Sequence, residues 1–219
     1  MTRSDTTRTA ARSPRAWATM LVVLLLGLAS DLISKHLAFE RIADAPVVIT
    51  REDVMAADRI GALLPRHEPV VVVPSVLEFT LVINEGAVFG IGAGKRWFFV
   101  VFTGGAMLFV LWLFATGARA NDAWAHTGAG LLLSGGLGNM YDRLQFACVR
   151  DFIHPLPGVE IAGREIWPYV SNVADFWVII GIVLLLWRAW MAPPESKPEP
   201  VKSEPSDGPD PSEVQAPAD

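Results

Sequence analysis

The stretch GNMYDRLQFACVRDFIHPL, residues 138–156, places four charged side chains directly behind an apolar run. They are Asp142, Arg143, Arg150 and Asp151, and the apolar runs of the chain otherwise contain very few charged residues. Burying an ionisable group in or beside a lipid bilayer costs roughly 2.5–3.5 kcal/mol on insertion scales. These charges therefore need a structural or functional reason, and the apolar runs around them decide the fold.

The composition indicates a membrane protein. Of 219 residues, 52% are hydrophobic and eight are Trp, which is too apolar for an ordinary soluble domain of this length. The net charge of −5 belongs to residues 191–219, which hold seven Asp/Glu against two Lys, while residues 1–190 hold sixteen charges of each sign. This balance lacks the basic surface that nucleic acids require, so no nucleic-acid partner is expected. The single cysteine excludes an internal disulfide.

Four apolar runs have roughly the 17–25 residues that a membrane span needs. They lie at 16–39, 97–118, 124–140 and 172–191. A cleaved signal peptide is the alternative for the first run, but the apolar character resumes beyond Asp31, which favours a retained helix. Four spans put both termini on one side, and the four Arg before the first span indicate that this side is cytoplasmic. We therefore predict an all-α integral membrane protein with a four-transmembrane-helix bundle.

The chain divides into three parts around these spans. We predict a cytoplasmic N-terminal segment over 1–15, a four-helix membrane domain over 16–191, and a disordered acidic Pro-rich tail over 192–219. Residues 40–96 form an extracytoplasmic loop in which apolar and polar residues alternate over VLEFTLVIN, the period of a half-buried strand. Together with the four valines at 70–73, this pattern predicts a small β-rich segment on the membrane surface.

Polar residues in the first and third predicted helices have helical spacing. Asp31 and Lys35 are four residues apart, which favours an ion pair. The alternative is a Ser–Lys peptidase in which Lys35 activates Ser30, Ser34 or another serine. Asn139, Asp142 and Arg143 end the third helix on one face, which predicts an Asp–Arg clamp there. Gly130, Ser134 and Gly138 are four apart, as in a face that lets a neighbouring helix approach closely.

Two aspartates belong to the same face of the bilayer, because the third and fourth helices are joined outside the membrane. Asp151 follows the third helix, and Asp175 opens the fourth, where Asn172 is placed to form a capping box with it. Two carboxylates held close share a proton and can activate water against a peptide bond, as in aspartic proteases. Because a helix N-terminus favours a negative charge, we assign the ionised form to Asp175 and the shared proton to Asp151. Arg150 is assigned only a solvent or headgroup contact.

Five segments in order give the chain its resemblance to a known family. They are DLISK at 31–35, NEGAVFG at 84–90, GGLGNMYDRL at 135–144, VRDFI at 149–153 and NVADFWVIIG at 172–181. In these motifs the chain resembles the bacterial lipoprotein signal peptidases, or signal peptidase II. The resemblance implies a membrane aspartyl endopeptidase of the inner membrane, with its active site near the outer face. It implies cleavage of diacylglyceryl-modified prolipoproteins just before the lipid-modified cysteine.

The same resemblance assigns roles to particular residues. The catalytic pair falls on Asp151 and Asp175, with no metal and no cofactor. Residues that support the site or bind substrate are Asp31, Lys35, Asn84, Gly86, Phe89, Asn139, Asp142, Arg143 and Asn172. The expected partners are lipid-modified prolipoproteins and membrane lipids, and the expected state is a monomer.

Some features depart from the family pattern, and one further function stays open. Ser171 replaces the usual Phe, Val88 is bulkier than usual, and the segment from Glu40 to Pro69 is longer than expected. From the residues alone, an ordinary turn with Asn and Gly in their usual places is favoured for the Asn84 segment, and the alternative is that it holds an extended peptide by strand-like hydrogen bonds. A small proton-coupled transporter remains the alternative outside the peptidases, because facing acids could relay protons. A metallopeptidase is disfavoured, since the four histidines are scattered and form no zinc motif.

Overall fold

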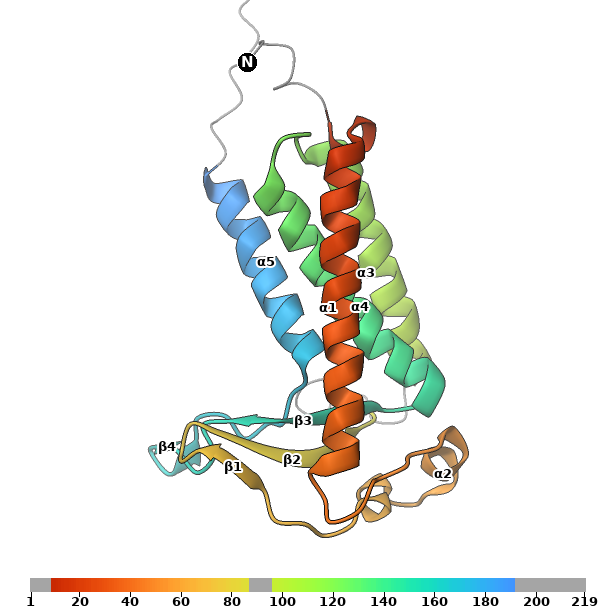
Figure 1. Ribbon diagram of the computed structural model, residues 1–219, viewed down its shortest axis with the longest axis vertical. Coiled ribbons are helices and arrows are strands. Elements are labelled where there is room, and N and C mark those ends of the chain that lie inside the picture. The colour runs from red at the N-terminus through yellow and green to blue at the C-terminus, as the bar shows by residue number, and fades with distance from the viewer. Residues whose placement is uncertain (1–8, 87–95, 192–219) are drawn as a thin grey trace, which may run out of the picture.

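The computed structural model describes residues 9–86 and 96–191. Four long helices pack side by side above a small sheet that crosses one end of the bundle (Figure 1). The helices are α1 (Pro14–Arg41), α3 (Arg96–Gly117), α4 (Ala123–Phe146) and α5 (Val173–Met191). The start of α1 and the end of α5 lie together at the end of the bundle away from the sheet. A short 3-10 helix, η2 (Ala10–Arg12), precedes α1.

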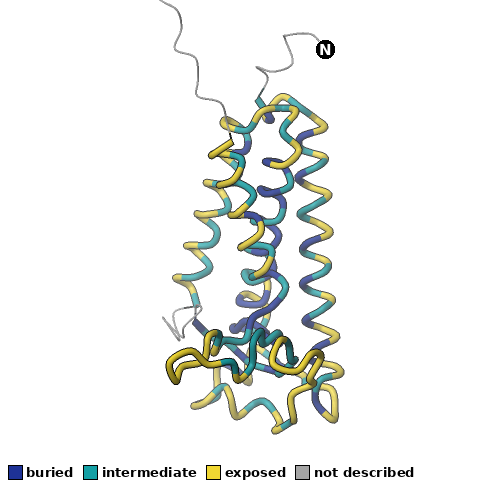
Figure 2. The backbone as a smooth tube through the Cα atoms, turned by 90° about the vertical axis from the view of Figure 1, so that its left-hand side faces the viewer, coloured by how far each residue is buried: buried dark blue, intermediate teal, exposed yellow. Residues whose placement is uncertain are grey.

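Three of these helices, α1, α3 and α5, are long and apolar enough to cross a membrane. Helix α4 is not among them: it is long enough, but its many Gly and polar residues, such as Ser134 and Asp142, make it less apolar. It packs against all three of the other long helices. Figure 2 shows buried positions along the interior of the bundle and exposed positions on the outer turns. Three spans are therefore supported by length and composition, and the predicted fourth span stays a prediction.

Small residues bring α4 close to α1. A Cβ added to Gly130 would lie 2.7 Å from the Met20 carbonyl oxygen, and one added to Gly138 would overlap the Asp31 carboxylate. Between them, Ser134 packs directly against Gly27 of α1. The predicted packing face of Gly130, Ser134 and Gly138 is thus confirmed. Its consequence for the site is that a carboxylate of α1 reaches the surface of α4.

The sheet has the order β1-β2-β3 and is antiparallel throughout. Strands β1 (Val70–Val73) and β2 (Leu77–Asn84) confirm the sequence prediction. Strand β3 (Val149–Pro155) was not predicted, because its first four residues are all buried and so show no alternation of apolar and polar positions. Its register with β2 places Val82 opposite Asp151. The sheet therefore carries one of the two candidate aspartates. A short hairpin of β4 (Glu160–Ile161) and β5 (Arg164–Glu165) follows β3.

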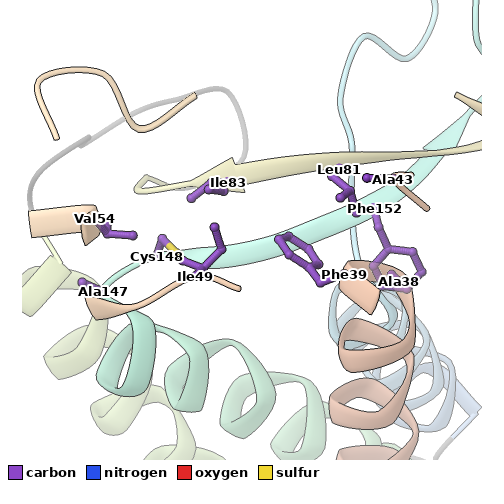
Figure 3. Packing of buried hydrophobic residues seen from close by; sticks show 10 residues of the cluster. All are labelled: Ala38, Phe39, Ala43, Ile49, Val54, Leu81, Ile83, Ala147, Cys148 and Phe152. Atoms are coloured by element: carbon purple, nitrogen blue, oxygen red, sulfur yellow. The ribbon is translucent and has the colours of Figure 1, made fainter. Parts of the chain in front are cut away.

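A second hydrophobic core lies outside the bundle, between the sheet and the segment after α1. This segment contains a short helix, α2 (Arg51–Ala56), and a 3-10 helix, η3 (Ile60–Leu63), which the β-rich interpretation of residues 40–96 did not include. The buried members of the core are Ala38, Phe39, Ala43, Ile49, Val54, Leu81, Ile83, Ala147, Cys148 and Phe152 (Figure 3). Burial raises the pKa of the Cys148 thiol to about 12, so this cysteine packs as a neutral apolar side chain. The segment between α1 and β1 thus packs against the sheet and the neighbouring ends of α1 and α4 through this core.

Candidate active site

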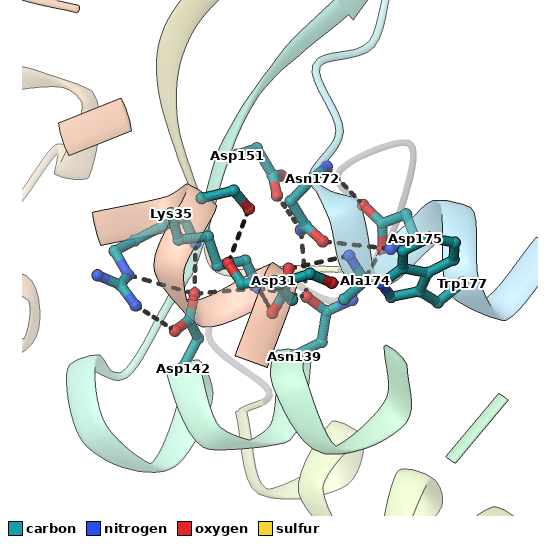
Figure 4. A network of polar contacts seen from close by, with 12 residues as sticks. Asp31, Lys35, Asn139, Asp142, Asp151, Asn172, Ala174, Asp175 and Trp177 are labelled. Atoms are coloured by element: carbon teal, nitrogen blue, oxygen red, sulfur yellow. Dashed lines mark hydrogen bonds and ion pairs between the residues drawn. The ribbon is translucent and has the colours of Figure 1, made fainter. Parts of the chain in front are cut away.

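Asp151 of β3 and Asp175 of α5 line one large cavity at the sheet end of the bundle (Figure 4). Its volume is about 1000 Å³. The cavity lies where β2, β3, α4 and the start of α5 meet. Its polar wall outside the two aspartates includes Asn84, Asn139, Arg143 and Asn172. The structure therefore brings the two predicted catalytic carboxylates to a common space.

Asp151 is 2% exposed and receives two amide hydrogen bonds. Asn172 Nδ2 donates to its Oδ1 at 2.6 Å, and Asn84 Nδ2 donates to its Oδ2 at 3.1 Å. Burial, and then the nearby charge of Asp175, raise the pKa of Asp151 to about 7, and the two amide bonds oppose this rise. Asp151 is thus poised to hold a proton near neutral pH.

Asp175 is anchored by the helix that it opens. Its Oδ2 accepts from the backbone N–H of Asn172 at 3.1 Å, and its own N–H donates to Asn172 Oδ1 at 3.2 Å. This reciprocal pair is the predicted capping box. The other carboxylate oxygen, Oδ1, accepts from Asn139 Nδ2 at 2.8 Å. Both Asp175 carboxylate oxygens therefore accept from N–H donors, and the side chain sits at the N-terminus of α5.

Asn172 joins the two carboxylates. Its Nδ2 group donates to Asp151, and also to Asn139 Oδ1 at 3.1 Å, while its oxygen accepts from the Asp175 backbone. It is fully buried. Both of its side-chain N–H donors and one acceptor site of its oxygen are used within the site. The distance and orientation of the two aspartates therefore depend on this one amide.

A chain of four alternating charges lies beside the dyad. Asp31 and Lys35 form the predicted ion pair, with 2.9 Å between Oδ2 and Nζ. Lys35 Nζ also lies 3.4 Å from Asp142 Oδ2, and Asp142 Oδ1 accepts from Arg150 Nη2 at 2.8 Å. Asp31 Oδ1 accepts from the backbone N–H of Ala174, which ties α1 to the start of α5. The two carboxylates and two cations balance, so the buried network has no net charge.

Two predictions about arginines were wrong. Arg143 does not pair with Asp142: its Nη2 donates to the Gly86 carbonyl at 2.8 Å, and its guanidinium stacks 5.0 Å from the Phe99 ring. The cation of the Asp142 clamp is Arg150, which was assigned to solvent or headgroups but is only 9% exposed. The physical reason is a change of chain direction: α4 ends in a left-handed residue at Ala147, and β3 then brings Arg150 back beside Asp142.

The Asn84 turn combines both of its interpretations. Asn84 Oδ1 accepts from the Gly86 N–H at 2.9 Å, as in an Asx turn, while its Nδ2 contacts Asp151. Gly86 is buried and linked to Arg143, so this turn is fixed to α4. Phe89, and the departure at Val88, lie outside the described residues.

The geometry contradicts the Ser–Lys alternative. In the described part of the chain, the Lys35 ammonium contacts Asp31, Asn139 and Asp142. The hydroxyls of Ser30 and Ser34 instead donate to backbone carbonyls of their own helix. The Lys35 ammonium is thus engaged by two carboxylates and an amide, and these two serines by backbone carbonyls, so they form no Ser–Lys dyad.

One wall of the cavity was missed from the sequence. It is formed by the segment before α5, which includes Trp167, Pro168, Tyr169 and Val170. The available signal was the pair of large aromatic residues, Trp167 and Tyr169, in a connection that has no other aromatic residue. Among residues 9–86 and 96–191, no group of three or more His, Cys, Asp or Glu side chains is arranged to hold a metal ion.

Comparison with known proteins identifies the family. The family model described as signal peptidase (SPase) II matches residues 23–191, which is most of the chain. The chain belongs to the signal peptidase II family. It is a membrane peptidase by this membership, and the resemblance seen in its motifs is confirmed. The family match contains Asp31, Asp151 and Asp175, and so includes both the charge network and the candidate dyad.

Individual relatives agree with the family. The lipoprotein signal peptidase of Streptococcus pyogenes serotype M1 is 36% identical over 118 residues, which are 54% of this chain and 72% of that protein. The protein of serotype M3 (strain SSI-1) is 35% identical over the same coverage. A solved bacterial membrane enzyme is 25% identical with a TM-score of 0.57, covering 79% of this chain and 88% of its own. A second such structure, 24% identical with the same TM-score, covers 80% and 94% and supports the fold.

Proposed function

We propose that this chain is an aspartyl endopeptidase that removes signal peptides from diacylglyceryl-modified prolipoproteins, cutting before the modified cysteine. The observation that carries the mechanism is the pair of carboxylates joined through Asn172 in one cavity. The substrate class rests on relatives that are lipoprotein signal peptidases. Substrates are prolipoproteins and the surrounding lipids are the other partners. The enzyme acts as a monomer without metal or cofactor.

The chemistry follows from the different surroundings of the two aspartates. Ionised Asp175 takes a proton from a water molecule whose oxygen attacks the scissile carbonyl carbon, and Asp151 gives its proton to the carbonyl oxygen. The tetrahedral diol then collapses, returning one proton to Asp151, while Asp175 transfers its proton to the leaving amine. Each aspartate ends in its starting state. The raised pKa of Asp151 supports its role as the acid.

The remaining predicted site residues act around this pair. Asn84, Asn139 and Asn172 orient the carboxylates, and Asp31, Lys35 and Asp142 lock the helices that carry them. Arg143 fixes the turn at Gly86. Phe89 keeps its proposed role in substrate binding from the family motif alone.

A second cavity supports an apolar substrate. It has a volume of about 350 Å³ and lies between α3, α4 and α5. Phe102, Met107 and Val110 line its apolar part, and it extends to Asn139 and Asp175. An apolar helix or acyl chain arriving from the bilayer could therefore reach the dyad without crossing a polar surface.

The membrane arrangement extends the proposal. We place all four long helices across the bacterial inner membrane, with both termini in the cytoplasm and the sheet and dyad at the outer face. Support comes from the three apolar helices, from the common end of α1 and α5, and from the Arg-rich start of the chain. In this arrangement residues 1–15 and the tail 192–219 are cytoplasmic, and residues 40–96 are outside. In this arrangement α4 crosses the membrane between its three neighbours. Its polar residues face the bundle interior and not lipid, which lowers the cost of burying them.

The test is the isosteric removal of each charge. Asp151→Asn and Asp175→Asn should each abolish cleavage of a synthetic diacylated prolipoprotein in a gel-shift assay. Asp58→Asn is the matched control, because Asp58 is an exposed aspartate of the extramembrane segment 40–96, and this variant should cleave at the wild-type rate. Full activity in either dyad variant would refute the aspartyl mechanism.

A further inference from the structure

Two buried side-chain N–H donors have no hydrogen-bond partner in the described part of the chain, and both belong to residues that line the large cavity. They are Arg143 Nε and Trp167 Nε1. A buried donor without a partner costs about 1–3 kcal/mol, so native structures rarely keep one without a reason. Their common location suggests that the reason is a group that enters this cavity.

Trp167 is held in place on three sides. Its carbonyl oxygen lies 3.2 Å from His154 Nε2, and the other ring nitrogen of His154 lies 2.8 Å from Glu78 Oε1. On one side of Trp167, the Ile166 N–H donates to the Val159 carbonyl at 2.8 Å. On the other side, Ser171 pairs with Ile153 of β3. The backbone that carries the indole is therefore fixed before any ligand arrives, and a substrate acceptor reaches the buried N–H by displacing the side chains that cover it.

We propose that the Trp167 indole N–H binds substrate. It has no partner among the described residues of the free protein, and it donates to a carbonyl oxygen of the bound prolipoprotein. The inference rests on the proposed peptidase function. An indole N–H can only donate, so its partner must be an acceptor. A diacylated prolipoprotein offers two sources of the same chemistry, the peptide carbonyls and the ester carbonyls of the lipid.

The fold sets where this contact lies relative to the dyad. His154, which holds Trp167, is three residues beyond Asp151 along β3, or about 10 Å at strand spacing. The Trp167 backbone is therefore anchored to β3 about three residues from Asp151. Trp167 binds and selects substrate at a distance from the chemistry, and His154 is its positioning residue.

The test measures binding without turnover. A fluorescent synthetic prolipoprotein peptide with a diacylglyceryl cysteine is titrated into detergent-solubilised Asp151→Asn, with and without Trp167→Phe. Phe keeps an aromatic ring but lacks the N–H, so the Kd should rise about two- to tenfold, as expected for one lost hydrogen bond. Trp190→Phe is the matched control, because Trp190 is 83% exposed and remote from the cavity, and it should leave the Kd unchanged.

Stability distinguishes a binding role from a structural one. Losing an unpartnered donor sacrifices no hydrogen bond, so Trp167→Phe should lower the melting temperature of the free protein only by the packing lost with the smaller ring. An unchanged Kd overturns the proposal.

A second probe with ether-linked alkyl chains lacks the ester carbonyls. Loss of the Trp167→Phe effect with this probe assigns the acceptor to the lipid, and persistence assigns it to the peptide. Cleavage of the peptide by Asp151→Asn would instead refute the aspartyl mechanism, and the Kd comparison would still decide the role of Trp167.

Discussion

The four-charge network makes a quantitative prediction about stability. Asp142 lies 2.8 Å from Arg150 and 3.4 Å from Lys35, and it is fully buried. At an effective dielectric constant of about 20, these separations correspond to attractions of about 6 and about 5 kcal/mol before desolvation is subtracted. Asp142→Asn removes both attractions and leaves two cations facing Asp31 alone. Because an unpaired buried charge typically costs about 3–5 kcal/mol, we expect a loss of that size.

The double variant Asp142→Asn/Arg150→Met should be more stable than the two single variants together imply. It removes one negative and one positive charge, and the pair of Asp31 and Lys35 remains balanced. Arg150→Met also keeps an apolar side chain against the Phe146 ring, which lies 4.2 Å from the guanidinium. We expect a coupling energy of about 1–3 kcal/mol between the two substitutions.

Thermal unfolding in detergent checks both statements. For a chain of this size, a loss of about 3–5 kcal/mol corresponds to a fall in Tm of about 6–20 °C. Glu40→Gln is the control, because its contact with His36 joins two exposed side chains and should change Tm little. Additive effects of Asp142→Asn and Arg150→Met, within about 0.5 kcal/mol, would show that the charges do not act as a network.

Three further predictions concern the dyad and its packing. The rate of cleavage should fall as pH rises through about 7, because Asp151 must be protonated to act as the acid and its pKa is about 7; a rate that is constant from pH 6 to 9 would contradict this assignment. Because the pKa of Asp151 is higher in the folded protein than in the unfolded chain, protonation of Asp151 adds to the free energy of unfolding. This contribution is fully present below about pH 4 and is lost as pH rises toward 7, and Asp151→Asn should remove the dependence. Gly138→Ala should lower both Tm and cleavage rate, because the new methyl group would overlap the Asp31 carboxylate; Gly61→Ala, where nothing lies nearby, is the control.

Features that depend on short-range spacing could be predicted from the sequence. The pair Asp31 and Lys35 follows from four-residue helical spacing, and the capping box of Asn172 and Asp175 from three-residue spacing at a helix start. The strands at 70–73 and 77–84 follow from composition and alternation. In each case the partners are neighbours along one element, so the local pattern already contains the contact.

Features that depend on a change of chain direction could not be predicted. Arg143 is next to Asp142 in sequence, but neighbouring helical residues point to different sides, and the true partner of Asp142 is Arg150 on β3. The strand β3 itself is buried on both sides and so lacks alternation. Trp167 reaches the cavity only because His154 and Ile153 of β3 hold its segment. These contacts join elements whose relative placement no local pattern encodes.

The charge network and the dyad are linked by the orientation of one amide. Asn139 Oδ1 accepts from Lys35 Nζ at 3.0 Å and from Asn172 Nδ2 at 3.1 Å, so its oxygen is fixed on the side of the cation. Its NH₂ group must then face Asp175, to which it donates at 2.8 Å. If Lys35 were replaced by an uncharged residue, the amide could rotate and present its oxygen to the Asp175 carboxylate, which would repel the ionised form that the mechanism needs. We therefore propose that Lys35 supports catalysis without contacting either aspartate of the dyad, by fixing which end of the Asn139 amide faces Asp175.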